Sequence, residues 1–328
     1  MFRWLVNVGL LALPIAATLG ILIGLQAHRQ ALGQQPLFSP PIITKWVEQT
    51  YCQRYHGVRP DTKGQQYTRL SSVPCSHNQP LTLAVNPNQW GIETGDPGFL
   101  CMNVTTYDNQ TYATKTTAPQ FKVFWQYPSF TDQRSVHAFP NIKLDDDVLP
   151  VKLQRVQEID VDFQWTMRLD NDTGPTSSLD DFKKANVNSN VAIDMFVDKD
   201  KEKAKDAEKA DFEVMVWFAA IGPATFAIGQ KEGPIMSKNV DGTNFNLFYG
   251  QNDRKQHVLT WKSTSNADEF HGDLAPLINE VLDTNRPGFP SSSDYLGYFS
   301  FGSEAYFSNK PVTFSVPSLS IDIRRTKS

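Results

Sequence analysis

The amino-acid sequence predicts an all-β protein, a two-sheet antiparallel β-sandwich with a single amphipathic helix packed outside a sheet. Three observations support this fold. Strand-like stretches dominate the chain after residue 46, and the connections between them are rich in turn-forming residues. One segment of the globular part has the apolar spacing of an amphipathic helix. A parallel α/β sheet would need several crossover helices, and the sequence pattern lacks them.

The N-terminal residues 1–27 predict either a membrane anchor or a cleaved signal peptide. The stretch 4–25 is apolar, with Asn7 as its one strongly polar residue. About 20 apolar residues suit a bilayer crossing, whereas the apolar part of a signal peptide has about 7–15. Cleavage after Ala27 would place the bulky Leu25 where a small residue is usual. Both alternatives stay open, and both predict a protein that is secreted or anchored with its globular domain outside.

The rest of the chain divides into a linker and one domain. Residues 28–45 contain Gln-Gln-Pro and Ser-Pro-Pro without sustained periodicity, which is typical of a stalk. From Trp46 to the end, residues 46–328 show no internal repeat and no second linker of that length. We therefore expect one globular domain over 46–328, present as a monomer.

Composition excludes several classes of function. The formal net charge is −4 and charged residues make up 20% of the chain, which argues against a polyanion-binding protein and therefore against a nucleic-acid partner. No CxxC pair or His/Cys cluster has the spacing of metal ligands. We expect neither a metal site nor an organic cofactor.

Two features fit a secretory compartment. The chain has three cysteines, Cys52, Cys75 and Cys101, so one disulfide and one remaining thiol are expected under oxidising conditions. The glycosylation acceptor pattern Asn-X-Thr begins at Asn103, Asn109 and Asn171.

Six stretches of the domain have strand-like patterns: 160–169, 190–197, 212–220, 245–249, 257–262 and 311–323, the last as one bent strand or two short ones. The first alternates most clearly. Its apolar side chains Val161, Phe163, Trp165, Met167 and Leu169 share one face. This alternation predicts a strand with one face in the core.

One helix is predicted between the fifth and sixth of these strands. Asp273 can cap a segment whose apolar residues follow helical spacing: Leu274, Leu277, Ile278, Val281 and Leu282. We expect this helix to pack outside a sheet. A run of charged residues, 198–210, separates two of the strands. Such a run indicates a solvated loop or a short exposed helix, and a partner-binding segment is the alternative.

A lone carboxylate stands in the otherwise apolar strand 212–218. Because successive side chains alternate between faces, one face holds Phe212, Val214, Val216 and Phe218. The other face holds Glu213, Met215 and Trp217. A carboxylate in such a place costs free energy unless it is paired or used. This second face suits the floor of a sugar-binding cleft.

Two further acids stand among apolar or aromatic neighbours, Asp194 between Ile193 and Met195, and Glu304 in the stretch 298–306. A single embedded acid can be a structural hydrogen-bond acceptor, and for Asp194 this alternative stays open. Two or three acids on one sheet indicate glycosidic cleavage. That reaction needs one ionised carboxylate at the anomeric carbon and one protonated carboxyl at the leaving oxygen.

An ordered series of segments carries a family resemblance. Its members are Asn88-Gln-Trp90-Gly91 followed by Cys101, then 124–127, 136–141, 190–196, Glu213-Val-Met-Val-Trp217, Tyr249-Gly250, Gly272-Asp273 and Gly302-Ser-Glu304-Ala-Tyr306. In this order they resemble glycoside hydrolase family 12, the small β-jelly-roll endoglucanases and xyloglucanases. The resemblance runs from about 81 to 323, and the series is specific although no single motif is.

The resemblance implies a retaining mechanism on a polysaccharide substrate, β-1,4-glucan or xyloglucan. Glu213 would be the nucleophile, Glu304 the acid/base, and Asp194 would hold Glu213 by a hydrogen bond. Trp90 would be a stacking platform, with Asn88 and Met215 as further sugar contacts. A place for Trp125 in the cleft wall is predicted beside the alternative of a core aromatic.

The family pattern also implies a Cys52–Cys101 disulfide, while Cys52–Cys75 remains an alternative and Cys75 is an additional cysteine. The long segment 52–90, the charged run 198–210 and the residues after Glu304 depart from the family pattern. Two other functions remain open at this point. One is a non-catalytic carbohydrate-binding module at the cell surface, which would not require both Glu213 and Glu304. The other is a transglycosylase that remodels wall glucans with the same residues.

Overall fold

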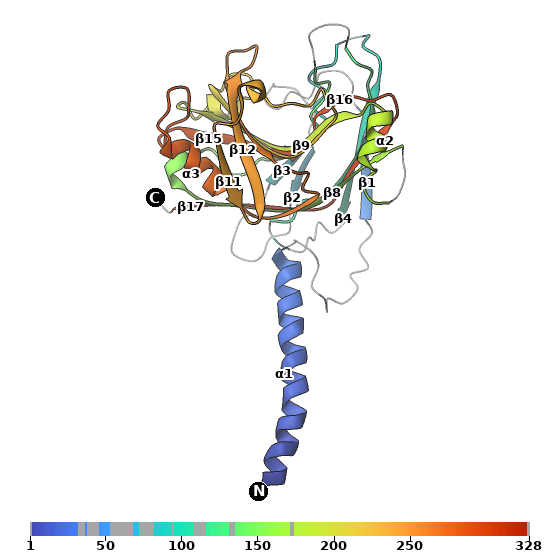
Figure 1. Ribbon diagram of the computed structural model, residues 1–328, viewed down its shortest axis with the longest axis vertical. Helices are drawn as coiled ribbons and strands as arrows, with labels where there is room; N and C mark the ends of the chain where they lie inside the picture. Colours follow the sequence, from blue (N-terminus) through green and yellow to red (C-terminus); the bar gives the residue numbers. More distant parts are fainter. Residues whose placement is uncertain are drawn as a thin grey trace.

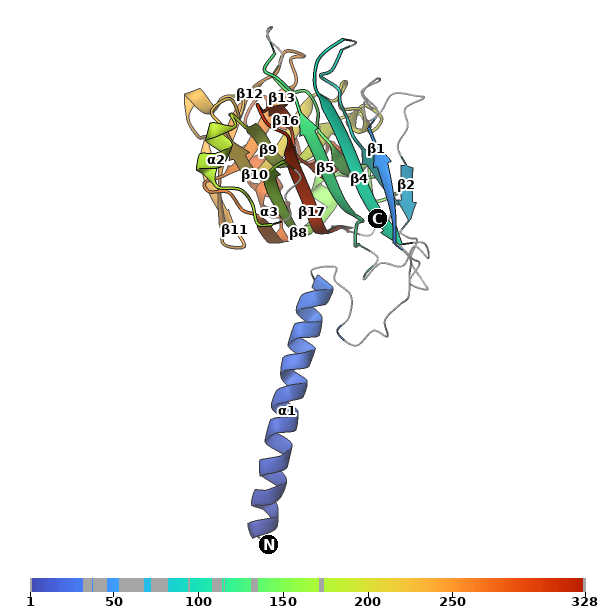
Figure 2. The ribbon, with the colours of Figure 1, turned by 90° about the vertical axis from the view of Figure 1, so that its right-hand side faces the viewer.

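The computed structural model describes residues 2–31, 37, 46–52, 68–71, 82–93, 95–107, 114, 116–130, 135–170 and 174–326. Two packed β-sheets form the globular domain, and helix α1 (Phe2–Ala31) extends away from them (Figures 1 and 2). Cys75, Asn109, Asn171 and most of the predicted stalk lie outside the described residues. Asn103 lies in β4.

Within the described residues, the first sheet has six strands. In spatial order they are β1 (Trp46–Tyr51), β4 (Phe99–Tyr107), β5 (Gln120–Gln126), β17 (Val312–Arg325), β8 (Val156–Leu169) and β14 (Glu269–Asp273). Figure 2 shows β4, β5, β17 and β8 side by side. The predicted C-terminal strand is a single one, β17, with an irregularity between Ser315 and Ser318 where it pairs with β8.

The second sheet of the described chain has eleven strands. Nine follow one spatial order: β11 (Met236–Val240), β12 (Thr243–Gln251), β13 (His257–Ser263), β10 (Phe212–Ile221), β9 (Asn188–Asp198), β15 (Tyr295–Gly302), β6 (Asn141–Leu144), β3 (Thr82–Asn86) and β2 (Thr68–Ser71). The short strands β16 (Ala305–Phe307) and β7 (Val151–Lys152) pair with β9 and β15. The predicted sandwich is confirmed, but one of the described strand pairs is not antiparallel: β10 and β13 run parallel. The β11–β12 hairpin connects these two strands in the chain.

The core lies between the sheets, where the alternation places it. Phe163 of the predicted strand 160–169 is fully buried, and its ring packs against Phe218 of β10 at 4.7 Å and Phe301 of β15 at 4.5 Å between centroids. Val161, Trp165 and Met167 are also buried. The predicted face of this strand is confirmed, and aromatic contacts of this kind join the two sheets.

Helix α3 (Ala275–Asp283) confirms the predicted amphipathic segment. The N-cap residue is Leu274 and not the predicted Asp273. The Asp273 carboxylate lies one residue earlier and accepts hydrogen bonds from the N–H groups of Ala275 and Ile159, so it ties the start of the helix to β8. A further short helix, α2 (Leu179–Lys184), was not predicted. Three 3₁₀ turns, η1 (Leu153–Arg155), η2 (Lys203–Lys205) and η3 (Gln230–Glu232), complete the described helical segments.

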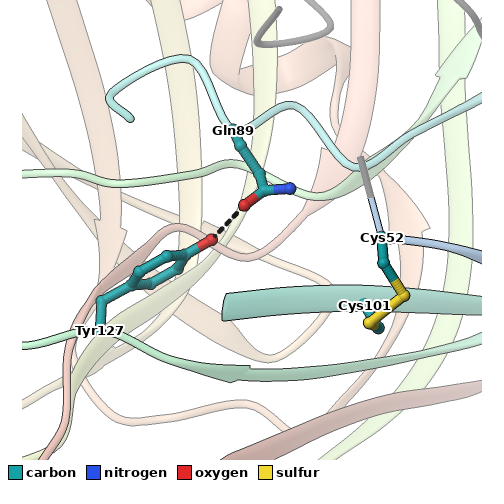
Figure 3. The surroundings of a disulfide bond; sticks show 4 residues. All are labelled: Cys52, Gln89, Cys101 and Tyr127. Atoms are coloured by element: carbon teal, nitrogen blue, oxygen red, sulfur yellow. Dashed lines mark hydrogen bonds between the residues drawn. A yellow bond between two sulfur atoms is a disulfide. The ribbon is translucent and has the colours of Figure 1, made fainter. Parts of the chain in front are cut away.

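The N-terminal region is linked covalently to the sandwich at β4. Cys52, directly after β1, forms a disulfide with Cys101 of β4, which confirms the pairing that the family resemblance implied (Figure 3). In the same view the Tyr127 hydroxyl donates to Gln89 Oε1 at 2.7 Å. In the part of the chain that the structure covers, no helix combines the length and apolarity needed for a membrane crossing.

Candidate active site

A cleft of about 550 Å³ lies on the face of the eleven-stranded sheet that points away from the core. The alternation of side chains along β10 explains which residues reach this cleft. Val214, Val216 and Phe218 of β10 are buried in the core between the sheets, so the alternate residues face outward. Glu213, Met215 and Trp217 all line the cleft, as the alternation of 212–218 predicts.

Asp194 and Glu213 reach the cleft from adjacent antiparallel strands. Asp194 of β9 pairs with Met215 of β10, and Glu213 pairs with Phe196. Side chains of paired residues lie on the same face of a sheet, so the two acids are diagonal neighbours on the cleft floor. The structure therefore brings together two carboxylates that stand 19 residues apart in the chain.

Glu304 enters the same cleft from the connection between β15 and β16. Asn190 of β9 holds it at two points: its side-chain oxygen accepts from the Glu304 N–H at 2.8 Å, and its Nδ2 donates to Glu304 Oε2. The Tyr306 hydroxyl donates to the same carboxylate oxygen at 3.1 Å. These contacts fix the carboxylate relative to β9, and through β9 relative to Glu213.

Glu213 has a different set of partners. The Asn252 side chain, in the turn between β12 and β13, donates to Glu213 Oε2 at 3.4 Å. The Arg254 guanidinium acts on it through its charge. Burial is the dominant influence and raises the pKa of Glu213 to about 7, although Asn252 and then Arg254 act in the opposite direction.

The three acids influence one another. Burial raises the pKa of Glu304 to about 7, and the nearby Glu213 carboxylate contributes to that rise. Burial also raises the pKa of Asp194, and the charges of Glu213 and Glu304 raise it further. Asp194 Oδ1 is buried and accepts no hydrogen bond from the described residues. Because like charges at close range cannot all ionise easily, this cluster retains protons at mildly acidic pH.

Apolar and aromatic side chains form the rest of the cleft. Met215 and Trp217 pack with Phe139 and Phe248 in a buried cluster on the floor. Trp90 is 40% exposed and lines the cleft, so its ring is accessible for stacking. Asn88, two residues earlier, is buried, lines the cleft and has a left-handed φ of 41°. The predicted residues Asn88, Trp90 and Met215 are thus gathered around the carboxylates.

The predicted place for Trp125 in the cleft wall is wrong. Trp125 lies in β5 of the six-stranded sheet, is 0% exposed, and belongs to the core between the sheets. Its ring stacks on Tyr127 with 6.0 Å between centroids. The alternative of a core aromatic is the one that the structure supports.

Several cleft residues had no signal in the sequence. Phe226 and Ile228, in the connection after β10, are 50% and 37% exposed and line the cleft. Glu208 belongs to the charged run 198–210, and Arg254 to a polar turn. Charged and turn-forming residues usually face solvent, so their sequence pattern alone could not place them here. Within the described residues, no cluster of three or more His, Cys, Asp or Glu side chains is arranged to hold a metal ion.

The comparisons with known proteins agree on one family. Residues 81–324 match the sequence model described as glycosyl hydrolase family 12. The chain is 27% identical over 236 residues to a probable xyloglucan-specific endo-β-1,4-glucanase A of Aspergillus fumigatus, covering 72% of this chain and 84% of that protein. It is 31% identical over 147 residues to endoglucanase A of Aspergillus kawachii, covering 44% and 56%.

The fold is similar to that of a solved structure, endoglucanase 3 of Trichoderma harzianum from family GH12. The TM-score is 0.61 at 20% sequence identity, and the match covers 87% of this chain and all of that one. At this identity the likeness supports the sandwich fold alone.

Proposed function

The chain belongs to glycosyl hydrolase family 12 and is a glycoside hydrolase, and we propose that it cleaves internal β-1,4 bonds of glucan or xyloglucan with retention of configuration. Glu213 is the nucleophile in this proposal and Glu304 the acid/base. The observation that carries the proposal is the meeting of these two glutamates in one cleft, close enough for the charge of Glu213 to raise the pKa of Glu304.

The proposed reaction is a double displacement. One Glu213 oxygen attacks the anomeric carbon while the glycosidic C–O bond breaks, and Glu304 transfers its proton to the departing oxygen. The product is a glycosyl ester on Glu213 and a free sugar hydroxyl. Glu304, now ionised, takes a proton from a water molecule as the water oxygen attacks the same carbon, and the ester bond to Glu213 breaks. The proton that Glu304 gives to the leaving sugar in the first step is thus replaced from water in the second, and the pair ends with the single proton with which it began.

The different surroundings of the two glutamates support these roles. Asn252 donates to Glu213 and the Arg254 charge faces it, and both favour an ionised nucleophile. Burial raises the pKa of both glutamates to about 7, and at Glu304 the neighbouring Glu213 charge contributes to the rise, which favours the protonated form that a general acid requires. Asp194 supports Glu213 in this proposal, because a protonated Asp194 carboxyl can donate a hydrogen bond to it.

The aromatic surface of the cleft supports a polysaccharide substrate. Trp90 and Phe226 are exposed rings on the cleft wall, and sugar rings present apolar C–H faces that pack on aromatic side chains. The names of the curated relatives favour β-1,4-glucan or xyloglucan as the substrate. We propose secretion or membrane anchorage through residues 4–25, which the Cys52–Cys101 disulfide supports.

Two substitutions test the roles separately. We expect Glu213→Gln to reduce kcat by at least about 10³-fold with unchanged folding, because the reaction loses its nucleophile. Glu304→Ala should lose most activity on substrates with poor leaving groups, and its turnover of a substrate with a good leaving group should rise with added azide, which attacks the glycosyl ester without a general base. Ordinary turnover by a folded Glu213→Gln enzyme, or no azide rescue of Glu304→Ala, would overturn the corresponding role. Product analysis at high acceptor concentration distinguishes hydrolysis from transglycosylation.

A further inference from the structure

The charged loop, residues 199–211 between β9 and β10, is a built part of the cleft. Asp198 is fully buried at its start, and its carboxylate accepts from the N–H groups of Asp200 at 2.7 Å and Asp211 at 3.0 Å. One side chain therefore ties both ends of the loop together. Ala204, in its middle, is completely buried. Most of its charged side chains are exposed, as the charged run predicted, but its backbone is anchored.

The turn between β12 and β13 fastens this loop to the cleft. The Gln256 side chain donates to the carbonyl oxygens of Ala207 at 2.9 Å and Ala210 at 2.8 Å. Its own oxygen accepts from Asn252 Nδ2 at 2.9 Å, and the same Asn252 nitrogen donates to Glu213. A continuous hydrogen-bonded path thus connects the charged loop with the proposed nucleophile.

Arg254 is held in the cleft from two sides. Its backbone N–H donates to Asn252 Oδ1 at 3.0 Å, which fixes the turn. Its guanidinium pairs with Glu208 of the charged loop at 3.2 Å. Both side chains line the cleft and are 47% and 38% exposed, respectively. These contacts restrict the conformations of the Arg254 side chain, so its positive charge stays within the cleft.

The charges that face Glu213 are strongly unbalanced. The acids lining the cleft are Asp194 from β9, Glu208 from the charged loop, Asp253 from the β12–β13 turn and Glu304 from the β15–β16 connection, with the Tyr306 hydroxyl from β16 beside them. Among the described residues that line the cleft, Arg254 is the only lysine or arginine. Arg254 belongs to the turn whose Asn252 donates to Glu213, and its charge favours ionised Glu213. Glu304 is held by Asn190 and Tyr306 instead.

We propose that Arg254, tethered by Glu208 and by the Asn252 turn, is a positioning residue that keeps the negative charge of the catalytic pair on Glu213, so that the shared proton stays on Glu304. The pair can lose its first proton from either carboxyl, and only ionised Glu213 with protonated Glu304 can react. A cation on the Glu213 side selects this arrangement. The proposal rests on the proposed function, because it assigns the nucleophile to Glu213.

The test is the pH dependence of kcat/KM for Arg254→Gln and Arg254→Lys on the polysaccharide that the wild-type enzyme cleaves fastest. For Arg254→Gln we expect the acidic limb to move to higher pH by roughly 0.5–1 unit, because ionised Glu213 loses its cation. This figure is small because Arg254 is half exposed and screened. Arg254→Lys should restore the limb to near its wild-type position. The shift should also shrink at 1 M salt.

Glu202→Gln is the matched control, because Glu202 pairs with Lys205 at 2.9 Å on the same loop and does not line the cleft. Its pH profile should coincide with that of the wild type. Melting temperatures of all variants show whether a loss of activity is a loss of folding, and a lower kcat/KM with an unmoved acidic limb would overturn the proposal. If Glu213→Gln remained active, the proposed function would fail instead. An inactive Glu213→Gln together with an unshifted Arg254→Gln profile rejects only the role of Arg254.

Discussion

At the scale of single residues, the cleft contains carboxyl groups whose burial lowers the stability of the folded chain when they are ionised. Glu213 and Glu304 are ionisable and mostly enclosed, and each has a pKa raised to about 7, mainly by burial. A raised carboxyl pKa means that the folded chain holds its proton more tightly than the unfolded chain does. For each glutamate, the free energy of unfolding therefore falls as the pH rises from the unfolded-state pKa of 4.5 to the folded-state pKa of about 7.

This sign leads to a prediction for Glu304→Gln. Below about pH 4.5 the carboxyl is protonated in both folded and unfolded states, so the amide should change the free energy of unfolding little. As the pH rises to about 7 and above, the wild type pays for an ionised, buried Glu304 next to Glu213 and the variant does not. We expect the variant to be more stable at pH 8 by on the order of 1–2 kcal/mol.

Denaturant unfolding of both proteins at pH 4.5 and pH 8 measures this difference. Glu232→Gln is a suitable control, because Glu232 is exposed in η3 and does not line the cleft. The expected pattern is a gain for Glu304→Gln that grows with pH and none for Glu232→Gln. A variant that is less stable than the wild type at pH 8 would contradict the assigned cost of the buried charge.

At the scale of elements, alternation in a strand was the most informative sequence signal. It placed Glu213, Met215 and Trp217 on one face because a strand has only two faces. Trp125 shares a face of β5 with the apolar Phe121 and Val123, opposite a largely polar face, so the same rule applied to β5 favours the core for Trp125. The charged loop is largely exposed and contains the short turn η2, as its charge predicted. Charge describes only its side chains, so the anchoring of its backbone by Asp198 and Gln256 could not be predicted.

Packing of the charged loop on β15 can be tested with Gly297→Ala. A methyl group at Gly297 would lie 2.4 Å from the carbonyl carbon of Ala204, so the loop must move away from the strand. We expect a loss of about 1–3 kcal/mol in the free energy of unfolding. A lower kcat/KM should accompany it, because the displaced loop no longer tethers Arg254. Thermal unfolding and steady-state kinetics measure both effects.

Gly174→Ala provides the comparison. A methyl group there meets no described atom within 4 Å, and the backbone does not have a left-handed φ. It should leave both stability and activity close to wild type. If Gly297→Ala behaved in the same way, the charged loop would not be a rigid wall of the cleft.

At the scale of the whole molecule, the sandwich brings together residues that are remote in the chain. Asp194, Glu213 and Glu304 come from β9, β10 and the β15–β16 connection, and β9 lies between the other two strands. The sequence predicted the three acids, the strands of Asp194 and Glu213, and the sandwich, because each follows from local pattern. It did not predict the strands β15 and β16 that flank Glu304. It could not predict the parallel pairing of β10 with β13, or the approach of Arg254 to Glu213, because both depend on how distant segments pack.

The central claim is that Glu213 forms a covalent bond to the sugar while Glu304 manages the proton. In a 2-deoxy-2-fluoro β-cellobioside, the fluorine slows both displacements, because it destabilises their positively charged transition states. A good leaving group restores the rate of the first displacement alone, so the glycosyl enzyme accumulates. Mass spectrometry of peptides from the trapped enzyme then locates the sugar. We expect a glycosyl adduct on the peptide that carries Glu213. Trapping of the sugar on a different carboxylate of the cleft would contradict it.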